Sequence, residues 1–115
     1  MEKKHDIDWS DFEKIDLRVG TILDVRDFLE ARKPAYQLHI DFGTTIGILK
    51  SSAQIASRYS KEELLNRQIV AVVNFPKKQI GTFMSQCLIL GAVGEKEGVV
   101  LLHPDLKVEN GTSIA

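Results

Sequence analysis

The feature that most restricts the fold of this chain is a strict alternation of apolar and polar residues between Tyr36 and Phe42. A period of two is what a β-strand with one buried face requires. Glycine and two threonines follow at residues 43–45 and predict a turn, and residues 46–50 predict a second strand. We therefore expect residues 35–50 to form a β-hairpin.

Further strands are predicted on both sides of this hairpin. Residues 15–25 are rich in β-branched side chains but contain Gly20, which predicts a long strand with a bend or a bulge. Residues 68–73 and 86–93 are strongly apolar runs typical of core strands, and residues 99–102 follow a glycine-containing turn. The chain is therefore predominantly β.

Two capping boxes predict short helices. Residues 10–13 and 60–63 both follow the pattern S-x-x-E, in which the serine oxygen and the glutamate carboxylate each accept a backbone N–H of the first turn. The second box leads into Leu64 and predicts a helix of about two turns that ends near Asn66.

The order of these elements predicts the fold class. A helix, three strands, a short helix and two strands is the order of the OB-fold, a five-stranded Greek-key barrel that binds oligonucleotides or other extended ligands. An SH3-like barrel explains the inserted helix less well. We expect one domain over residues 1–115, all-β with short helices, with an N-terminal helical extension at 1–14 and a C-terminal extension at 94–115.

Composition excludes several classes of protein. Hydrophobic residues make up 43% and charged residues 27% of the chain, as in average globular proteins, and no apolar run is long enough to span a membrane. The start of the sequence lacks the apolar centre of a signal peptide, so we expect a cytoplasmic protein without membrane insertion. The single cysteine, Cys87, excludes an internal disulfide and is interpreted as a buried apolar residue.

No pattern of reactive side chains indicates an enzyme. His5, His39 and His103 are scattered, and the chain has no paired carboxylates, catalytic triad or metal-ligand spacing. We expect neither a catalytic site nor a bound metal or cofactor. Basic residues are instead concentrated in the middle, where residues 31–78 contain eight basic and three acidic side chains. This suits a polyanionic ligand, although solvated lysines on loops would give the same count.

Four sequence segments together resemble the tRNA-binding domain family. They are DLRVG at 16–20, ARKPAY at 31–36, DFG at 41–43 and VNFPKKQIG at 73–81. The resemblance implies a homodimeric OB-fold protein of the bacterial or archaeal cytoplasm whose relatives bind tRNA by its shape. From about Asp11 onward the chain is most similar to a branch of small free-standing proteins regarded as export-related chaperones for unfolded or precursor polypeptides.

The resemblance also implies which residues form the binding surface. By motif these are Asn74, Lys77, Lys78, Gly81 and Ser85, and less directly Lys33, Ser51 and Ser52. Where synthetase-type members read Ser-x-Gly-Met, this chain reads SQCL at 85–88, which weakens the transfer of tRNA contacts. Serines are also common where a strand meets a turn, so Ser51 and Ser52 have a structural alternative.

Side-chain chemistry adds apolar candidates to this surface. Phe75 and Phe83 are able to stack on a base, and together with Tyr36 and Met84 they are able to contact a polypeptide. The alternative is that the two phenylalanines belong to the core. The ligand is therefore either tRNA or an unfolded polypeptide. The apolar N-terminal segment around Trp9 either covers an end of the barrel or packs in a dimer interface, and we expect the C-terminal extension to take part in dimerisation.

Overall fold

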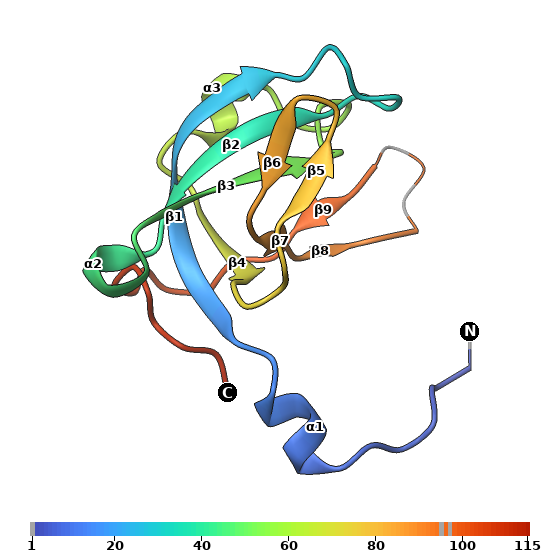
Figure 1. Ribbon diagram of the computed structural model, residues 1–115, viewed down its shortest axis with the longest axis vertical. Helices are drawn as coiled ribbons and strands as arrows, with labels where there is room; N and C mark the ends of the chain where they lie inside the picture. Colours follow the sequence, from blue (N-terminus) through green and yellow to red (C-terminus); the bar gives the residue numbers. More distant parts are fainter. Residues whose placement is uncertain (1, 95, 97) are drawn as a thin grey trace.

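A computed structural model describes residues 2–94, 96 and 98–115 and shows a small antiparallel barrel (Figure 1). Its main sheet has five strands in the order β3-β2-β1-β4-β7. The strands are β1 (Leu17–Asp27), β2 (Tyr36–Asp41), β3 (Ile48–Ala53), β4 (Gln68–Val72) and β7 (Leu88–Ile89). This nearly closed barrel, with β1 at its centre, confirms the predicted fold class.

The two ends of the sheet meet between β3 and the residues before β7. The Gln86 backbone N–H donates to the Lys50 carbonyl at 2.8 Å, and the Gln86 side-chain oxygen accepts the Lys50 backbone N–H at 2.9 Å. The buried Ser51 hydroxyl donates to the Cys87 carbonyl at 3.1 Å. Side chains thus supply part of the hydrogen bonding that closes the barrel.

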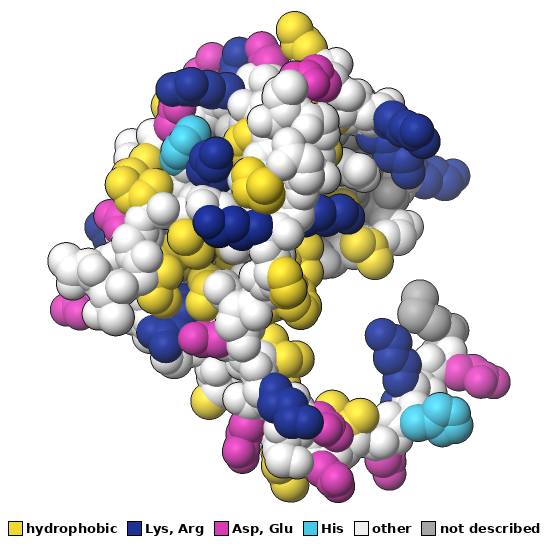
Figure 2. Space-filling view, in the orientation of Figure 1, with side chains coloured by type: hydrophobic (Ala, Val, Ile, Leu, Met, Phe, Trp, Pro, Cys, Tyr) yellow, Lys and Arg dark blue, Asp and Glu magenta, His cyan; other side chains and the backbone are white. Residues whose placement is uncertain are grey.

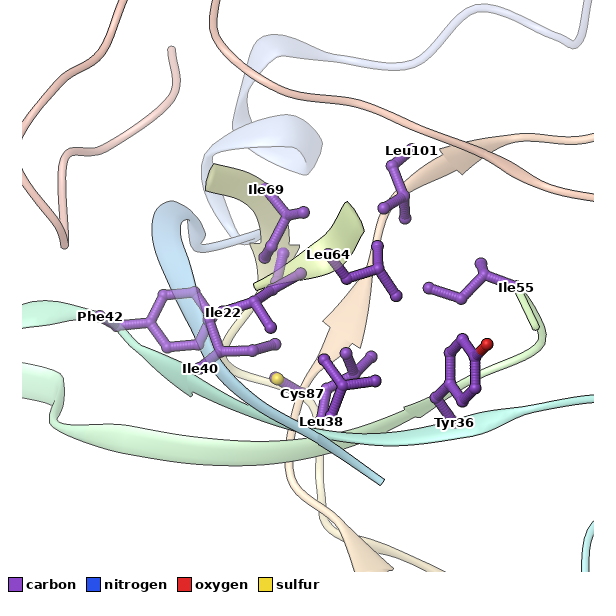
Figure 3. Packing of buried hydrophobic residues seen from close by; sticks show 12 residues of the cluster. Ile22, Tyr36, Leu38, Ile40, Phe42, Ile55, Leu64, Ile69, Cys87 and Leu101 are labelled. Atoms are coloured by element: carbon purple, nitrogen blue, oxygen red, sulfur yellow. The ribbon is translucent and has the colours of Figure 1, made fainter. Parts of the chain in front are cut away.

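The hairpin predicted from the alternating segment is confirmed as β2 and β3. Tyr36 pairs with Ala53 and Asp41 with Ile48. The connection is a helical turn, α2 (Gly43–Ile46), so the second strand begins two residues later than expected. The apolar residues of β2 point into the barrel, where they form the main core with β1, β4 and α3 (Lys61–Leu64) (Figure 3).

The irregularity predicted in β1 lies at Leu23 and not at Gly20. The register with β2 shifts between Ile22 and Asp24, which leaves Leu23 as a bulge. Gly20 remains in regular pairing with β4. A Cβ at Gly20 would lie 2.6 Å from Ile40 and 2.8 Å from the Phe42 ring, so the glycine is needed for close packing.

One capping box is confirmed and the other is wrong. The Ser60 hydroxyl accepts the Glu63 N–H at 3.2 Å and the Glu63 carboxylate accepts the Ser60 N–H at 3.0 Å, although α3 is shorter than two turns. Helix α1 (Trp9–Glu13) begins after Asp8 and not after Ser10, because the Asp11 carboxylate takes the Asp8 N–H at 3.0 Å.

The remaining strands form two small hairpins outside the main sheet. β5 (Lys78–Ile80) pairs with β6 (Phe83–Ser85), a hairpin that the sequence pattern did not predict. β8 (Gly91–Ala92) pairs with β9 (Val100–Leu101), so the run predicted as one strand over 86–93 is divided between β7 and β8. Figure 1 shows both small hairpins on the same side of the barrel.

The two termini differ in how they contact the barrel. The C-terminal segment lies along β1, where the Val19 N–H donates to the Thr112 carbonyl and the Ile114 N–H to the Leu17 carbonyl, both at 3.0 Å. The N-terminal segment with α1 projects away from the barrel, and Trp9 is 87% exposed (Figure 1). The arm therefore does not cover an end of the barrel here. No helix in the described ranges is long and apolar enough to cross a bilayer.

Candidate ligand-binding groove

A groove of about 550 Å³ separates the β5–β6 hairpin from β9 and the end of β3. We call it the hairpin groove and define it by its described lining residues. These are Ser52, Ala53, Gln54, Ile55, Phe75, Pro76, Lys78, Ile80, Ser85, Cys87, Leu88, Ile89, Val99 and Leu101. The lining is mostly apolar, with one lysine and without an acidic side chain among these residues, so it suits apolar groups that carry or adjoin negative charge.

The hairpin above the groove is shaped by a two-residue turn and a small apolar cluster. Gly81 has φ +58° at the first turn position, as a type II′ turn requires. On the inner side, Phe83 packs against Phe28 with ring centroids 5.6 Å apart, and Ala35 and Ile80 join them. The loop between β1 and β2 and the hairpin thus share one cluster.

A polar contact joins the same two segments at the surface. The Thr82 hydroxyl donates to the Glu30 carboxylate at 2.8 Å. A Cβ at Gly81 would lie 2.8 Å from the other carboxylate oxygen of Glu30. The loop that carries Lys33 is therefore fixed to the hairpin that borders the groove.

Basic side chains lie on and near the β5–β6 hairpin. Lys77 and Lys78 are exposed and, like Lys33, form no ion pair with another residue in the described part of the chain. The Lys50 ammonium lies 5.2 Å from the centre of the Phe83 ring. Figure 2 shows lysine and arginine side chains interleaved with hydrophobic ones around the hairpin. The surface is mixed basic and apolar.

The structure brings part of the predicted site together. Ser52, Phe75, Lys78 and Ser85 all line the hairpin groove, and the Ser85 hydroxyl accepts the Ser52 backbone N–H at 3.4 Å. Phe75 is 51% exposed, so it is accessible and not a core residue. Lys77 lies beside these residues in the sequence and is exposed.

Other predicted residues are buried. Ser51 is 1% exposed and closes the barrel, and Phe83 is 7% exposed in the cluster with Phe28. Tyr36 lies in the main core and its hydroxyl donates to the Tyr59 carbonyl at 2.8 Å (Figure 3). These side chains support the groove from within and do not present a contact surface.

Asn74 is exposed, but its amide is already in use. Its oxygen accepts the Asp16 backbone N–H at 3.0 Å and its nitrogen donates to the Lys14 carbonyl at 2.7 Å. The side chain thereby holds the segment before β1 against the end of β4, and this structural role accounts for one donor and one acceptor of the amide. Lys33 lies on a separate shallow depression beside Arg32, and Met84 is opposite Gln79 on the hairpin, outside the groove lining.

Sequence reasoning missed the opposite wall of the groove. Val99 precedes β9, Leu101 lies in β9 and Ile55 follows β3, and no local pattern indicates that they lie near β5. Leu88 stands where synthetase-type members carry methionine, and it supplies a half-exposed apolar side chain to the groove. The departure from the family pattern thus falls on the lining itself.

Reactive chemistry is not built into the described residues of this surface. Cys87 is buried, which raises the pKa of its thiol to about 12 despite a hydrogen bond with Ser51. The described residues contain no group of three histidine, cysteine, aspartate or glutamate side chains placed to hold a metal ion.

Comparison with known proteins identifies the family to which the chain belongs. The family model described as "Putative tRNA binding domain" matches residues 17–113. The structure is similar to the chaperone CsaA of Bacillus anthracis, with 49% identity and a TM-score of 0.91 over 96% of this chain and 100% of that one. It is also similar to the CsaA chaperone protein of Picrophilus torridus, with 55% identity, a TM-score of 0.90 and the same coverage.

Methionine–tRNA ligases are more distant curated relatives. The enzyme of Thermococcus onnurineus is 39% identical over 94% of this chain, which spans only 14% of the length of that enzyme. The similarity thus concerns one part of a much longer protein. The match over residues 17–113 covers most of the sequence, and the chain belongs to the tRNA-binding domain family.

Proposed function

We propose that the protein is a non-enzymatic, homodimeric chaperone of the cytoplasm that binds unfolded or export-destined polypeptides in the hairpin groove. The observation that carries this proposal is the lining of the groove, which is mostly apolar, with Ile55 and Leu101 on one wall and Ile80 and Lys78 on the other. Such a surface accepts many apolar side chains without a fixed sequence. The full-length similarity to two proteins named CsaA chaperones supports the same reading.

Suppression of client aggregation tests the proposal. Light scattering of a chemically denatured enzyme diluted into buffer should be reduced by the wild-type protein and much less by Phe75→Ser, because that change removes an exposed apolar side chain from the groove. Leu29→Ser is the matched control, since Leu29 is 93% exposed and lies outside the groove lining. Equal suppression by both variants would contradict a role for the groove, and no suppression by the wild type would contradict the function.

A second candidate function is tRNA binding, favoured by the exposed basic side chains of Lys77 and Lys78 close to the exposed ring of Phe75. Lys33 adds a positive charge on the loop that is fixed to the hairpin, and none of the three lysines forms an ion pair with another described residue. Lysines provide attraction to phosphates and little sequence discrimination. Replacing both Lys77 and Lys78 by alanine should weaken tRNA binding and reduce its salt dependence by roughly one to two phosphate contacts. The control pair Lys14→Ala and Lys107→Ala removes the same charge from other elements and should change both quantities less.

Homodimerisation is part of the first proposal. The exposed apolar side chains of Ile7, Trp9 and Phe12 give the N-terminal arm a surface that a second copy would cover. Two grooves in one particle would raise the avidity for a long ligand without any new contact. Sedimentation equilibrium should show a dimer for the wild type and a larger dissociation constant for Trp9→Ala; a monomeric wild type would contradict the proposal.

A further inference from the structure

The strand β5 has a free edge beside the groove. Ile80 and Phe83 flank the two-residue turn of the hairpin, so they exchange its first backbone hydrogen bonds. The next pair, Gln79 and Met84, is then a non-hydrogen-bonded pair, and the N–H and C=O of Gln79 point away from β6. In the described part of the chain, β5 pairs with β6 alone and no other backbone hydrogen bond involves Gln79.

The strand with this free edge borders the hairpin groove. Lys78 and Ile80 of β5 line the groove, and Val99 before β9 lines it as well. A strand placed beside β5 would point every second side chain into the groove, because side chains alternate between the two faces of a sheet. There those side chains would meet Leu88 and Ile89.

The charges of this edge favour one kind of occupant. Lys77 and Lys78 are exposed without an ion-pair partner among the described residues, and the described lining contains no acidic side chain. Two copies of β5 placed edge to edge would bring these lysines together, which disfavours self-pairing. An acidic segment is attracted to the same edge.

We infer that β5 binds an extended, acidic and apolar polypeptide segment as an additional antiparallel or parallel strand, with backbone hydrogen bonds to Gln79. The inference rests on the proposed polypeptide binding and specifies how the client is held. Main-chain hydrogen bonds provide affinity without regard to sequence, and the groove selects apolar side chains at alternate positions. The ligand is therefore an extended segment that carries apolar side chains at alternate positions and acidic residues near Lys77 and Lys78.

Backbone-methylated peptides test this inference on the wild-type protein. The probe is a short fluorescein-labelled peptide in which valine and threonine alternate between acidic ends, measured by fluorescence anisotropy. Two versions carry N-methyl groups on alternate sets of backbone nitrogens. Only one set faces β5, so one version should bind at least about tenfold more weakly and the other within about twofold of the unmodified peptide. If a methylated peptide shifted its register against β5 by one residue, threonine instead of valine would point into the groove, so this shift should not restore binding.

A substitution in β5 tests the protein side. Gln79→Pro removes the outward N–H while leaving the hydrogen bonds to β6, because proline is tolerated at the outward-facing position of an edge strand. Gln79→Ala is the control, since it keeps the N–H and removes only the side chain. Peptide affinity should fall at least about tenfold in Gln79→Pro and stay near the wild-type value in Gln79→Ala. Circular dichroism of both variants establishes that the barrel is folded.

The outcomes separate this inference from the proposed function. If the wild type binds the unmodified peptide and both methylated versions equally well, strand addition is wrong and polypeptide binding stands. If the wild type binds no peptide, both are wrong. Loss of tRNA binding in Gln79→Pro, with peptide binding unchanged, would assign this edge to RNA and overturn the inference.

Discussion

The carboxylate of Glu30 accepts a 2.8 Å hydrogen bond from the hydroxyl of Thr82, which joins the loop after β1 to the turn of the β5–β6 hairpin. Below this contact, Phe28 packs against Phe83. The two loops that flank the ligand face of an OB-fold are therefore one connected unit in this protein. The position of the hairpin, and with it the width of the groove, depends on both contacts.

Breaking the polar contact should loosen the hairpin more than it destabilises the fold. Glu30→Ala removes the acceptor at the surface and should lower the free energy of unfolding by no more than ~1 kcal/mol. Client affinity should fall a few-fold because the groove wall is less fixed. Glu30→Gln keeps an acceptor oxygen for Thr82 and should bind like the wild type. Binding of labelled, reduced and carboxymethylated α-lactalbumin measures this, and equal behaviour of the two variants would show that the hydrogen bond does not matter.

Gly20 should be intolerant of any side chain. Alanine at this position places its Cβ within 2.6 Å of Ile40 and 2.8 Å of the Phe42 ring, and this overpacking should cost about 1–3 kcal/mol. Urea unfolding monitored by circular dichroism measures the change. Gly47→Ala is a useful contrast because nothing lies within 4 Å of its added Cβ, so only its backbone angle of φ +83° opposes the substitution. An unchanged urea midpoint for Gly20→Ala would contradict the packing role.

The two phenylalanines of the predicted site should respond differently to truncation. Phe83 is buried, so Phe83→Ala should lower the free energy of unfolding by roughly 3 kcal/mol or more. Phe75 is half-exposed, so Phe75→Ala should change stability by less than ~1 kcal/mol. Urea unfolding of both variants checks this. A loss of client binding in Phe75→Ala then reports on the groove, whereas the same loss in Phe83→Ala reports on the fold.

The Cys87 thiol should be unreactive in the native protein. Burial raises the pKa of Cys87 to about 12 from an ordinary value of 9.0, so the nucleophilic thiolate is scarce at pH 8. Labelling with a thiol reagent at pH 8 should be slow in buffer and fast in denaturant. Rapid labelling of the native protein would contradict the burial of Cys87.

The raised pKa of Cys87 also has a consequence for stability. The unfolded chain loses the thiol proton from about pH 9, whereas the native protein keeps it to about pH 12. The contribution of Cys87 to the free energy of unfolding is therefore complete below pH 9 and is lost as the pH rises from 9 to 12.

Local signals predicted the parts of the fold that local interactions determine. The alternation from Tyr36 to Phe42 predicts the β2–β3 hairpin, and the capping box at Ser60 predicts α3. In both cases the backbone hydrogen bonds form between residues that are close in the sequence. Near the N-terminus, Asp8 and Ser10 are both good caps with an acidic residue three positions later. The sequence does not distinguish them, and the structure uses Asp8.

Features that depend on distant segments were beyond such signals. The bulge in β1 falls at Leu23, shortly after β1 changes its partner from β4 to β2 at Thr21. It does not fall at Gly20, whose role is to leave room for Ile40 and Phe42. For the site, the family motif led to Lys78 and Ser85 and side-chain chemistry led to Phe75, and all three line the groove. It did not show that Tyr36 is buried or that β9 forms the opposite wall, because both depend on how the closed barrel packs.

Site-specific photo-cross-linking tests polypeptide binding in the hairpin groove most directly. p-Benzoylphenylalanine is placed at Phe75, inside the groove, or at Leu29, which is outside the lining and more exposed, at 93% against 51%. Nuclease-treated protein is then irradiated with reduced, carboxymethylated α-lactalbumin, a permanently unfolded chain. Cross-linked client should form from position 75 and only weakly from position 29, and excess unlabelled client should compete it away. Equal cross-linking from the two positions, or none from position 75, would contradict binding in this groove.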